Sequence, residues 1–182
     1  VLRGHVEPVP GARELIYALG NVDAERGVDH EWNVYRAECA VQIKVQVSGF
    51  DAGPGGNHGI HLHTTGLCEA PDFTSAGGHF NPATKKHGLD SPEGAHAGDL
   101  SNIQFYPDGS AAYETVTEGI TLGAGANSLF DADGAAIIIH AGPDDGVTDP
   151  TGNSGARIAC GVIVADEQSA ASAAPTPAAP PP

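Results

Sequence analysis

The sequence has few cationic residues, few aromatic residues, no long apolar run and no methionine. Eight Lys and Arg stand against 23 Asp and Glu, and the formal net charge is −15 with neutral His. The largest cationic cluster is the pair Lys85 and Lys86, so nucleic acid and anionic membrane surfaces are poor partners. No stretch approaches ~18 consecutive apolar residues, and we therefore expect no membrane insertion by this chain.

Methionine is absent even at position 1, and the N-terminus lacks the charged-then-apolar pattern of a signal peptide. We therefore expect a processed or trimmed chain from which any targeting peptide has been removed. Cysteine is also scarce. Three Cys leave one thiol after a single disulfide, and their spacing fits neither a zinc ribbon nor a C-x-x-C redox motif. By contrast, nine His are many for a chain of 182 residues.

Length and composition predict one folded domain over residues 12–167, between two irregular ends. Residues 1–11 carry two Pro, two charged side chains and one His, and they are predicted to be irregular. Residues 168–182 contain only Gln, Ser, Ala, Pro and Thr, which is typical of a disordered tail or linker. Two interpretations of this tail stay open, a tether to a cell envelope and a frayed end.

The domain is predicted to be all-β. The 25 Gly and 14 Pro indicate many turns between short strands. The clearest strand covers residues 39–47, where Cys, Val, Ile, Val and Val alternate with polar residues and Ala. Cys39 lies on the buried side of this pattern, so a reduced core thiol is expected there. Further strands are predicted over residues 14–19, 32–37, 59–63, 99–106, 111–117, 135–140 and 158–164, with a hairpin turn at 107–109.

About eight short strands without a convincing helix predict an antiparallel Greek-key sandwich or barrel. One connection is unusually long, because residues 64–97 show neither strand nor helix periodicity. Loops of this length in a compact domain are usually functional or disordered. A disulfide and a metal ion would hold such a loop in one shape.

The histidines suggest metal chemistry. His61 and His63 alternate with apolar residues in a strand, so both imidazoles lie on one face, although a pair of surface His on an edge strand has the same pattern. His140 ends an apolar strand, where a neutral core His is the usual outcome, unless it joins the first pair. A second group supplies three imidazoles and a carboxylate, a donor set suited to closed tetrahedral zinc. This group is His79, His87, His96 and Asp99.

Together these motifs resemble the copper-zinc superoxide dismutase family. The resemblance covers roughly residues 39–165 and rests on the order and spacing of HGIHLH, SAGGHFNP, KKHG, HAGDL, HAGPDD and GNSGARIACGVI. It implies a Greek-key barrel whose metals lie outside the barrel under two long active-site loops. It also implies dismutation of superoxide to dioxygen and hydrogen peroxide by a redox-cycling copper, bridged through His79 to a structural zinc.

The resemblance assigns a role to each matching residue. It implies copper binding by His61, His63, His79 and His140. It implies zinc binding by His79, His87, His96 and Asp99, so that His79 bridges both ions and carries a proton during turnover. It further implies an Asp144 carboxylate between His61 and His87, superoxide binding by Arg157, Thr151 at the channel rim, a Cys68–Cys160 disulfide and a structural His58. Taken alone, Asp144 could be an ordinary loop residue and Arg157 could pack against backbone in a Gly-rich turn.

Some features depart from the cytosolic pattern of the family. Cys68 lies only five residues after His63, which is closer to the bacterial secreted branch and predicts a secreted, periplasmic or cell-surface protein. A homodimer is one candidate assembly, and the sequence does not decide it. The second active-site loop, residues 141–155, is short and has no Lys. No function is predicted for the acidic insertion at residues 21–31, while His5 and His30 are expected to be solvated.

Two other functions are alternatives to the enzyme. A copper-delivery protein on the same sandwich typically lacks a copper ligand or the Arg, and this sequence retains all of them. An envelope domain whose His cluster clips a loop with zinc would show no turnover with copper present. The sequence therefore favours the dismutase.

Overall fold

The computed structural model of the chain describes residues 2–5, 14–21, 40–48, 50 and 55–164. The secondary structure of these residues is almost entirely strand. It consists of β1 (Leu2–His5), β2 (Glu14–Asn21), β3 (Ala40–Ser48), β4 (Gly56–His58), β5 (Ile60–His63), β6 (Ile103–Phe105), β7 (Ala111–Glu118), β8 (Ala135–His140), β9 (Arg157–Ile163) and one short 3-10 helix, η1 (Thr74–Ala76). None of the described residues belongs to a helix that is long and apolar enough to cross a membrane.

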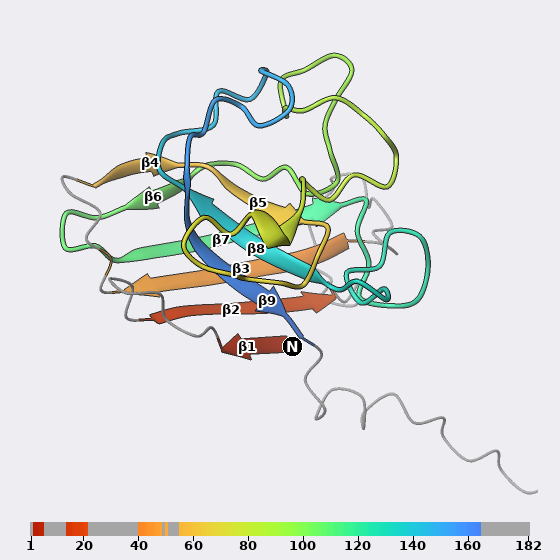
Figure 1. Cartoon of the computed structure of the whole chain (residues 1–182), viewed down its shortest axis with the longest axis horizontal. Helices are drawn as coiled ribbons and strands as arrows, with labels where there is room; N and C mark the ends of the chain where they lie inside the picture. Colours follow the sequence, from red (N-terminus) through yellow and green to blue (C-terminus); the bar gives the residue numbers. More distant parts are fainter. Residues whose placement is uncertain (1, 6–13, 22–39, 49, 51–54, 165–182) are drawn as a thin grey trace, which may run out of the picture.

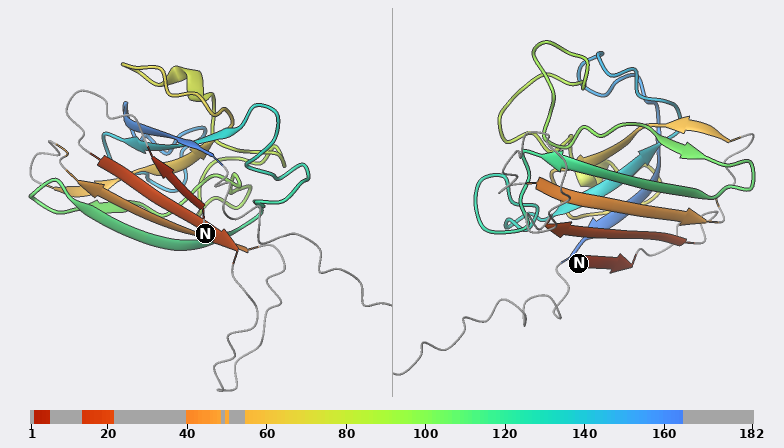
Figure 2. Two further views of the ribbon diagram at one scale, coloured as in Figure 1. Left: turned by 90° about the horizontal axis from the view of Figure 1, so that it is seen from below. Right: turned by 180° about the vertical axis from the view of Figure 1, so that it is seen from behind.

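The strands form two antiparallel sheets that face each other. The large sheet has the order β1-β2-β3-β7-β6-β4 and the small sheet the order β5-β8-β9. In Figure 1 the small sheet crosses in front of the large one, and the right view of Figure 2 shows the large sheet from behind. Because β3 pairs with β7 and not with the next strand along the chain, the connection crosses over as in a Greek key. The predicted antiparallel all-β fold is confirmed.

Alternation along β3 explains how the core forms. Val41, Ile43, Val45 and Val47 are buried, while Lys44 and Gln46 between them are exposed. This pattern is the one expected for a strand with one face on the core and the other in solvent. The buried face of β3 joins a single apolar cluster with residues of the small sheet, including Ile60, Leu62, Ile137 and Ile139.

Strands β5 and β8 differ from β3 because every residue in them is buried. Their apolar face packs against the large sheet. Their opposite face is covered by the long connection of residues 64–97, where Phe73 and Ala76 pack with Ala136, Ile138 and Cys160 in a second, smaller cluster. The small sheet is therefore the middle layer of the molecule, and the loops form a third layer over it.

Gly59 divides one extended segment between the two sheets. Before it, β4 pairs with β6 in the large sheet, and after it β5 pairs with β8 in the small one. The main chain of Gly59 donates to Gly142 O at 2.8 Å and accepts from His140 N at 2.8 Å. A Cβ at this position would lie 2.8 Å from the Cβ of Ser154, so only glycine lets the second loop approach so closely.

Several predicted boundaries need correction. Residues 2–5 were predicted to be irregular, but they form β1, which pairs with β2 from Leu2↔Leu19 to His5↔Ile16. The prediction relied on charged residues and Pro, but main-chain pairing tolerates charged side chains, and both Pro follow residue 5 in the sequence. The predicted strand over 99–106 is shorter, Ile103–Phe105, because the residues before it are used in loop contacts that are described below.

The hairpin turn predicted at residues 107–109 is confirmed, with a Tyr106 N to Ser110 O hydrogen bond of 2.8 Å and a positive φ of 76° at Gly109. The predicted strand over 32–37, the Cys39 thiol, His30, nearly all of the acidic insertion and the tail over 168–182 lie outside the described residues. The domain limits at 12 and 167 therefore stay a prediction.

Candidate metal centre

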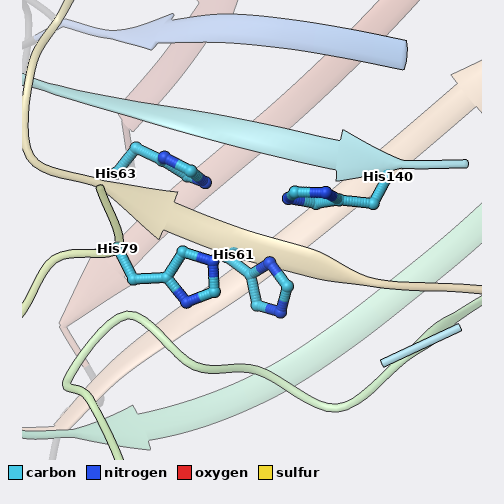
Figure 3. A group of neighbouring side chains, drawn as sticks. All are labelled: His61, His63, His79 and His140. Carbon is cyan, nitrogen blue, oxygen red and sulfur yellow. The ribbon is translucent and has the colours of Figure 1, made fainter. Parts of the chain in front are cut away.

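Four histidines converge on the loop-covered side of the small sheet. His61 and His63 come from β5, His140 ends β8, and His79 lies in the long loop, where it forms an isolated bridge with His63. The side chains of His61, His63 and His140 share one face because the register pairs His61 with Ile138 and His63 with Ala136. Figure 3 shows the four rings turned toward a common space. Their centroids lie 4.0 to 6.4 Å apart.

Each of these rings has one nitrogen held by the protein. His61 Nε2 donates to Asp144 Oδ2 at 2.5 Å, and His63 Nδ1 donates to Gly77 O at 3.0 Å. His140 Nδ1 donates to Gly155 O at 3.1 Å, while His79 Nδ1 lies 2.8 Å from Asp99 Oδ1. These contacts fix the ring orientation and direct the second nitrogen of each ring inward.

The four inward nitrogens have no hydrogen-bond partner among the described residues, although all are buried. They are His61 Nδ1, His63 Nε2, His79 Nε2 and His140 Nε2. An unpaired buried polar atom is unfavourable by about 1 to 3 kcal/mol, so four such atoms facing one space call for a ligand. One atom from each ring lies within 4.8 Å of the others, and a metal ion at the centre would satisfy all four.

Burial keeps these imidazoles neutral. It lowers the pKa of His61 and His140 from 6.5 to about 4, and that of His63 to about 2. The hydrogen bond to Asp144 offsets part of the effect at His61. Neutral imidazole is the form that binds metal ions, so the site is prepared for a cation at neutral pH.

A second cluster surrounds Asp99. Three ring nitrogens approach Asp99 Oδ1, namely His79 Nδ1 at 2.8 Å, His87 Nδ1 at 3.1 Å and His96 Nδ1 at 3.2 Å. Four ligands at about 2.0 to 2.1 Å from a tetrahedral zinc would lie ~3.3 Å apart, so these separations match a zinc cage. All four residues are buried.

Asp99 is held in its ionised form. Its Oδ2 accepts hydrogen bonds from Gly88 N at 2.9 Å and His96 N at 3.0 Å. Burial raises the pKa of Asp99, but the His79 contact and the Gly88 N–H outweigh burial, and the pKa lies well below its usual range. A carboxylate with one oxygen tied to the backbone and the other facing three imidazoles is a preformed cation ligand.

His79 belongs to both clusters. Its Nδ1 faces Asp99 and its Nε2 faces the four-histidine space. A ring that binds cations through both nitrogens must lose both protons, and two nearby positive charges make that state accessible. The geometry therefore brings together all the ligands predicted for both metals, with His79 between them.

Asp144 also connects the two clusters. Its Oδ2 accepts from His61 Nε2 at 2.5 Å and from His87 Nε2 at 3.0 Å, and its Oδ1 accepts from Gly146 N at 2.6 Å. Burial raises the pKa of Asp144, but the hydrogen bonds from His61 and Gly146 outweigh burial, and the pKa lies below its usual range. Gly152 has a positive φ, and a Cβ there would lie 2.1 Å from Asp144 Oδ1, so glycine leaves room for this carboxylate.

Arg157 lies beside the four-histidine cluster. Its main chain pairs with His140, and its guanidinium donates from Nη1 to Phe73 O at 2.6 Å and from Nη2 to Gly77 O at 2.7 Å. Gly77 O therefore accepts from both Arg157 and His63. Burial is the largest cause of the low pKa of His63 and His140, and the Arg157 charge lowers both further. The guanidinium contacts backbone and presents a fixed cation at the site.

The Cys68–Cys160 disulfide is present, with a Cα–Cα distance of 5.6 Å. It joins the long loop to β9, three residues after Arg157. The loop is thus attached at Cys68 and at the carbonyls of Phe73 and Gly77.

His58 is buried and donates from Nδ1 to His140 O at 2.8 Å, which agrees with a structural role.

Thr151 is exposed, and its carbonyl accepts from Ser154 Oγ at 2.8 Å. Its position at a channel rim stays a prediction.

Other residues that orient the histidines were not predicted from the sequence, because most act through backbone atoms, as Gly77 and Gly155 do. Sequence reasoning also missed Asn102, whose side chain bonds to the main chain of Asp144 across 42 positions of sequence. No local pattern could signal so distant a pair.

Comparisons with known proteins agree with this geometry. The family model of copper/zinc superoxide dismutase (SODC) matches residues 30–163. Superoxide dismutase (Cu-Zn) 1 of Aquifex aeolicus is 48% identical over 129 residues, which cover 70% of this chain and 75% of that protein. Superoxide dismutase (Cu-Zn) of Caulobacter vibrioides is 44% identical over 133 residues, 71% and 75% of the two chains. The crystal structure of a SOD-like protein from Bacillus subtilis matches with a TM-score of 0.64 and 41% identity, over 68% of this chain and 82% of that one.

Proposed function

Because this chain belongs to the copper/zinc superoxide dismutase family, we propose that the four-histidine cluster is its copper site and the Asp99 cluster its zinc site. The family reaction is the dismutation of superoxide to dioxygen and hydrogen peroxide, and the protein is an enzyme of this type with copper and zinc as cofactors. The observation that carries the site assignment is the set of four buried ring nitrogens without a partner among the described residues.

The donor sets support this division of the metals. The first cluster offers only imidazole nitrogens, a donor set that suits copper. Copper, when bound there, supplies the one-electron redox chemistry. The second cluster offers three nitrogens and one carboxylate oxygen, which would hold a zinc ion with four protein ligands and would leave no position for substrate. Zinc bound there would have a structural role and an electronic effect on the copper site through the shared His79.

The chain itself contributes proton handling and anion binding. His79 Nε2 faces the copper cluster and is the nitrogen that can take up and release a proton during turnover. Arg157 is held by two carbonyls with its charge next to His63 and His140, where it can hold superoxide by a charge-assisted hydrogen bond. Asp144 fixes the rings of His61 and His87.

The proposed function is tested by superoxide decay, measured on the metal-free protein and after adding zinc alone, copper alone, or both. We expect activity with copper and the highest activity with both metals. A protein that binds both metals but leaves superoxide decay at the buffer rate would favour a copper-delivery or structural role and would overturn the proposal.

We also propose an extracytoplasmic location. The Cys68–Cys160 disulfide supports it, since structural disulfides persist in oxidising compartments. Thiol counting on the denatured protein should give one free thiol per chain without reductant and three with it. A count of three before reduction would contradict the proposal.

The homodimer stays a prediction. Light scattering on the protein as it elutes from a size-exclusion column would measure its mass and decide between monomer and dimer.

A further inference from the structure

Asn102 makes a paired contact with the main chain of Asp144. Its Nδ2 donates to Asp144 O at 2.8 Å, and its Oδ1 accepts from Asp144 N at 2.8 Å. One planar amide thus satisfies both polar groups of a single residue, as the opposite residue does in an antiparallel strand pair. We infer that Asn102 is a positioning residue that sets the orientation of Asp144 and, through it, the geometry of both metal sites. This inference rests on the metal assignment proposed above.

The contact fixes a residue that no strand holds. Asp144 lies in the second loop, between the end of β8 and the start of β9. Its carboxylate nevertheless makes short contacts to His61 Nε2 and His87 Nε2, at 2.5 and 3.0 Å. Hydrogen bonds of this length tolerate little displacement. Asn102 binds the N–H and the C=O of Asp144, which belong to the two peptide units on either side of its Cα. It therefore limits the rotation of the main chain from which the carboxylate projects.

The two rings that Asp144 contacts serve different metals. His61 directs Nδ1 into the copper cluster, and His87 directs Nδ1 toward Asp99 in the zinc cluster. Asn102 follows the zinc ligand Asp99 by three residues, and Asp99 forms an isolated bridge with His61. Asn102 therefore ties the segment that carries a zinc ligand to the carboxylate that orients one ligand of each metal. Groups that orient metal ligands typically change metal affinity about 10- to 100-fold when they are mutated.

A second asparagine provides a matched control. Asn81 makes the same paired contact with the main chain of Lys85, with Nδ2 to Lys85 O at 2.9 Å and Lys85 N to Oδ1 at 3.0 Å. Lys85 is exposed. Unlike Asp144, it has no carboxylate that could orient a metal ligand. A role limited to loop anchoring would make both asparagines equivalent, whereas positioning of Asp144 makes only Asn102 matter for the metals.

The test is Asn102→Asp. This change keeps the shape and the acceptor for Asp144 N, but it removes the donor to Asp144 O and places two oxygens against each other. We expect the dissociation constant for zinc, measured by chelator competition, to rise about 10-fold. We also expect the electron paramagnetic resonance spectrum of bound Cu(II) to change. Asn81→Asp should leave both properties as in the unmodified protein, and Asn102→Ala, read in the same way, provides a second variant.

A double-mutant cycle with Asp144→Ala separates positioning from general loop support. If Asn102 acts through the Asp144 carboxylate, Asn102→Asp should change zinc affinity less than ~2-fold when that carboxylate is absent. Unchanged zinc affinity and an unchanged Cu(II) spectrum in Asn102→Asp, or a full 10-fold loss that persists in the Asp144→Ala protein, would overturn the inference. These readouts do not use activity, so a wild-type protein without dismutase activity would contradict the proposed function and leave this test intact.

Discussion

The two faces of the small sheet are built from the same strands but completed in different ways. On one face, Ile60 and Leu62 of β5 and Ile137 and Ile139 of β8 pack into the main core. On the other, His61, His63 and His140 leave ring nitrogens unpaired. The apolar face is complete when the chain folds, because apolar packing needs no further partner.

The metal-binding face depends on three further elements. They are the disulfide that attaches the long loop, the neutral state of the histidines, and the cations that the open nitrogens require. Figure 1 shows the two loops that carry many of these groups lying next to each other at one end of the molecule. The Lys86–Asp149 ion pair and the Asp90 N to Gly146 O hydrogen bond connect these loops. Changes to the loop layer should therefore affect metal binding and pH response as well as stability, whereas changes to the core should affect stability alone.

The largest effect is expected from removing the disulfide. In the chain-entropy model, a closed loop with a sequence separation of 92 contributes ~4 to 5 kcal/mol to the free energy of unfolding. Cys68→Ser with Cys160→Ser should lower stability by about that amount, measured by denaturant unfolding of the metal-free protein. Arg157 should also lose its fixed position, since its acceptors lie in the released loop. A double variant with unchanged stability would show that the disulfide does not stabilise the loop layer.

The next effect concerns pH. The pKa values of His61, His63 and His140 are lower in the folded chain than the ordinary 6.5, so the unfolded chain binds more protons as the pH falls below 6.5. The metal-free protein should therefore lose stability between pH 7 and 5.5, by roughly 4 kcal/mol for the three residues together. Bound metal should suppress this loss until it dissociates. Stability of the metal-free protein that rises over this interval would contradict the assigned protonation states.

A smaller effect is expected at the substrate. The net charge of −15 is largely screened beyond a Debye length of ~8 Å at physiological salt, so nearby charges decide the capture of superoxide. Arg157→Glu should keep both metals and lower the second-order rate at least ~10-fold, which corresponds to about 1.4 kcal/mol. Added salt should slow the wild-type enzyme less than a family member with a Lys-lined channel.

Lys44→Glu provides the control for this charge reversal. Lys44 is exposed on β3 of the large sheet and pairs with Glu114, and its reversal changes the net charge by the same amount. The rate of this variant should stay close to that of the wild type. An Arg157→Glu protein with full metal content and an unchanged rate would remove the role assigned to Arg157.

The smallest effect is expected from the apolar face. Ile139→Val removes one methyl group from a fully buried position, and it should lower the free energy of unfolding by about 1 kcal/mol. Because Ile139 faces the core and not the loops, zinc affinity and the spectrum of bound copper should not change. A clear change in either metal property would show that the two faces are not independent.

The residues of the two candidate metal clusters, six His and one Asp, were predictable because they stand in motifs whose order and spacing carry information. The strands were predictable where one face is buried, as in β3. What escaped prediction depends on the backbone and on distant pairs. The Gly77 and Gly155 carbonyls that orient His63 and His140 have no side-chain signature. Asn102 could not be linked to Asp144 before the fold brought them together.

The most direct test of the account is elemental analysis of the reconstituted, active protein and of its His79→Ala variant. The two clusters share one residue, His79, and together offer two sites of four ligands each, so we expect one copper and one zinc per chain in the wild type. His79→Ala removes a ligand from both sites, and after equal dialysis it should retain less of each metal. An active wild-type sample without zinc, or a His79→Ala protein that keeps both metals in full, would contradict the shared two-metal site.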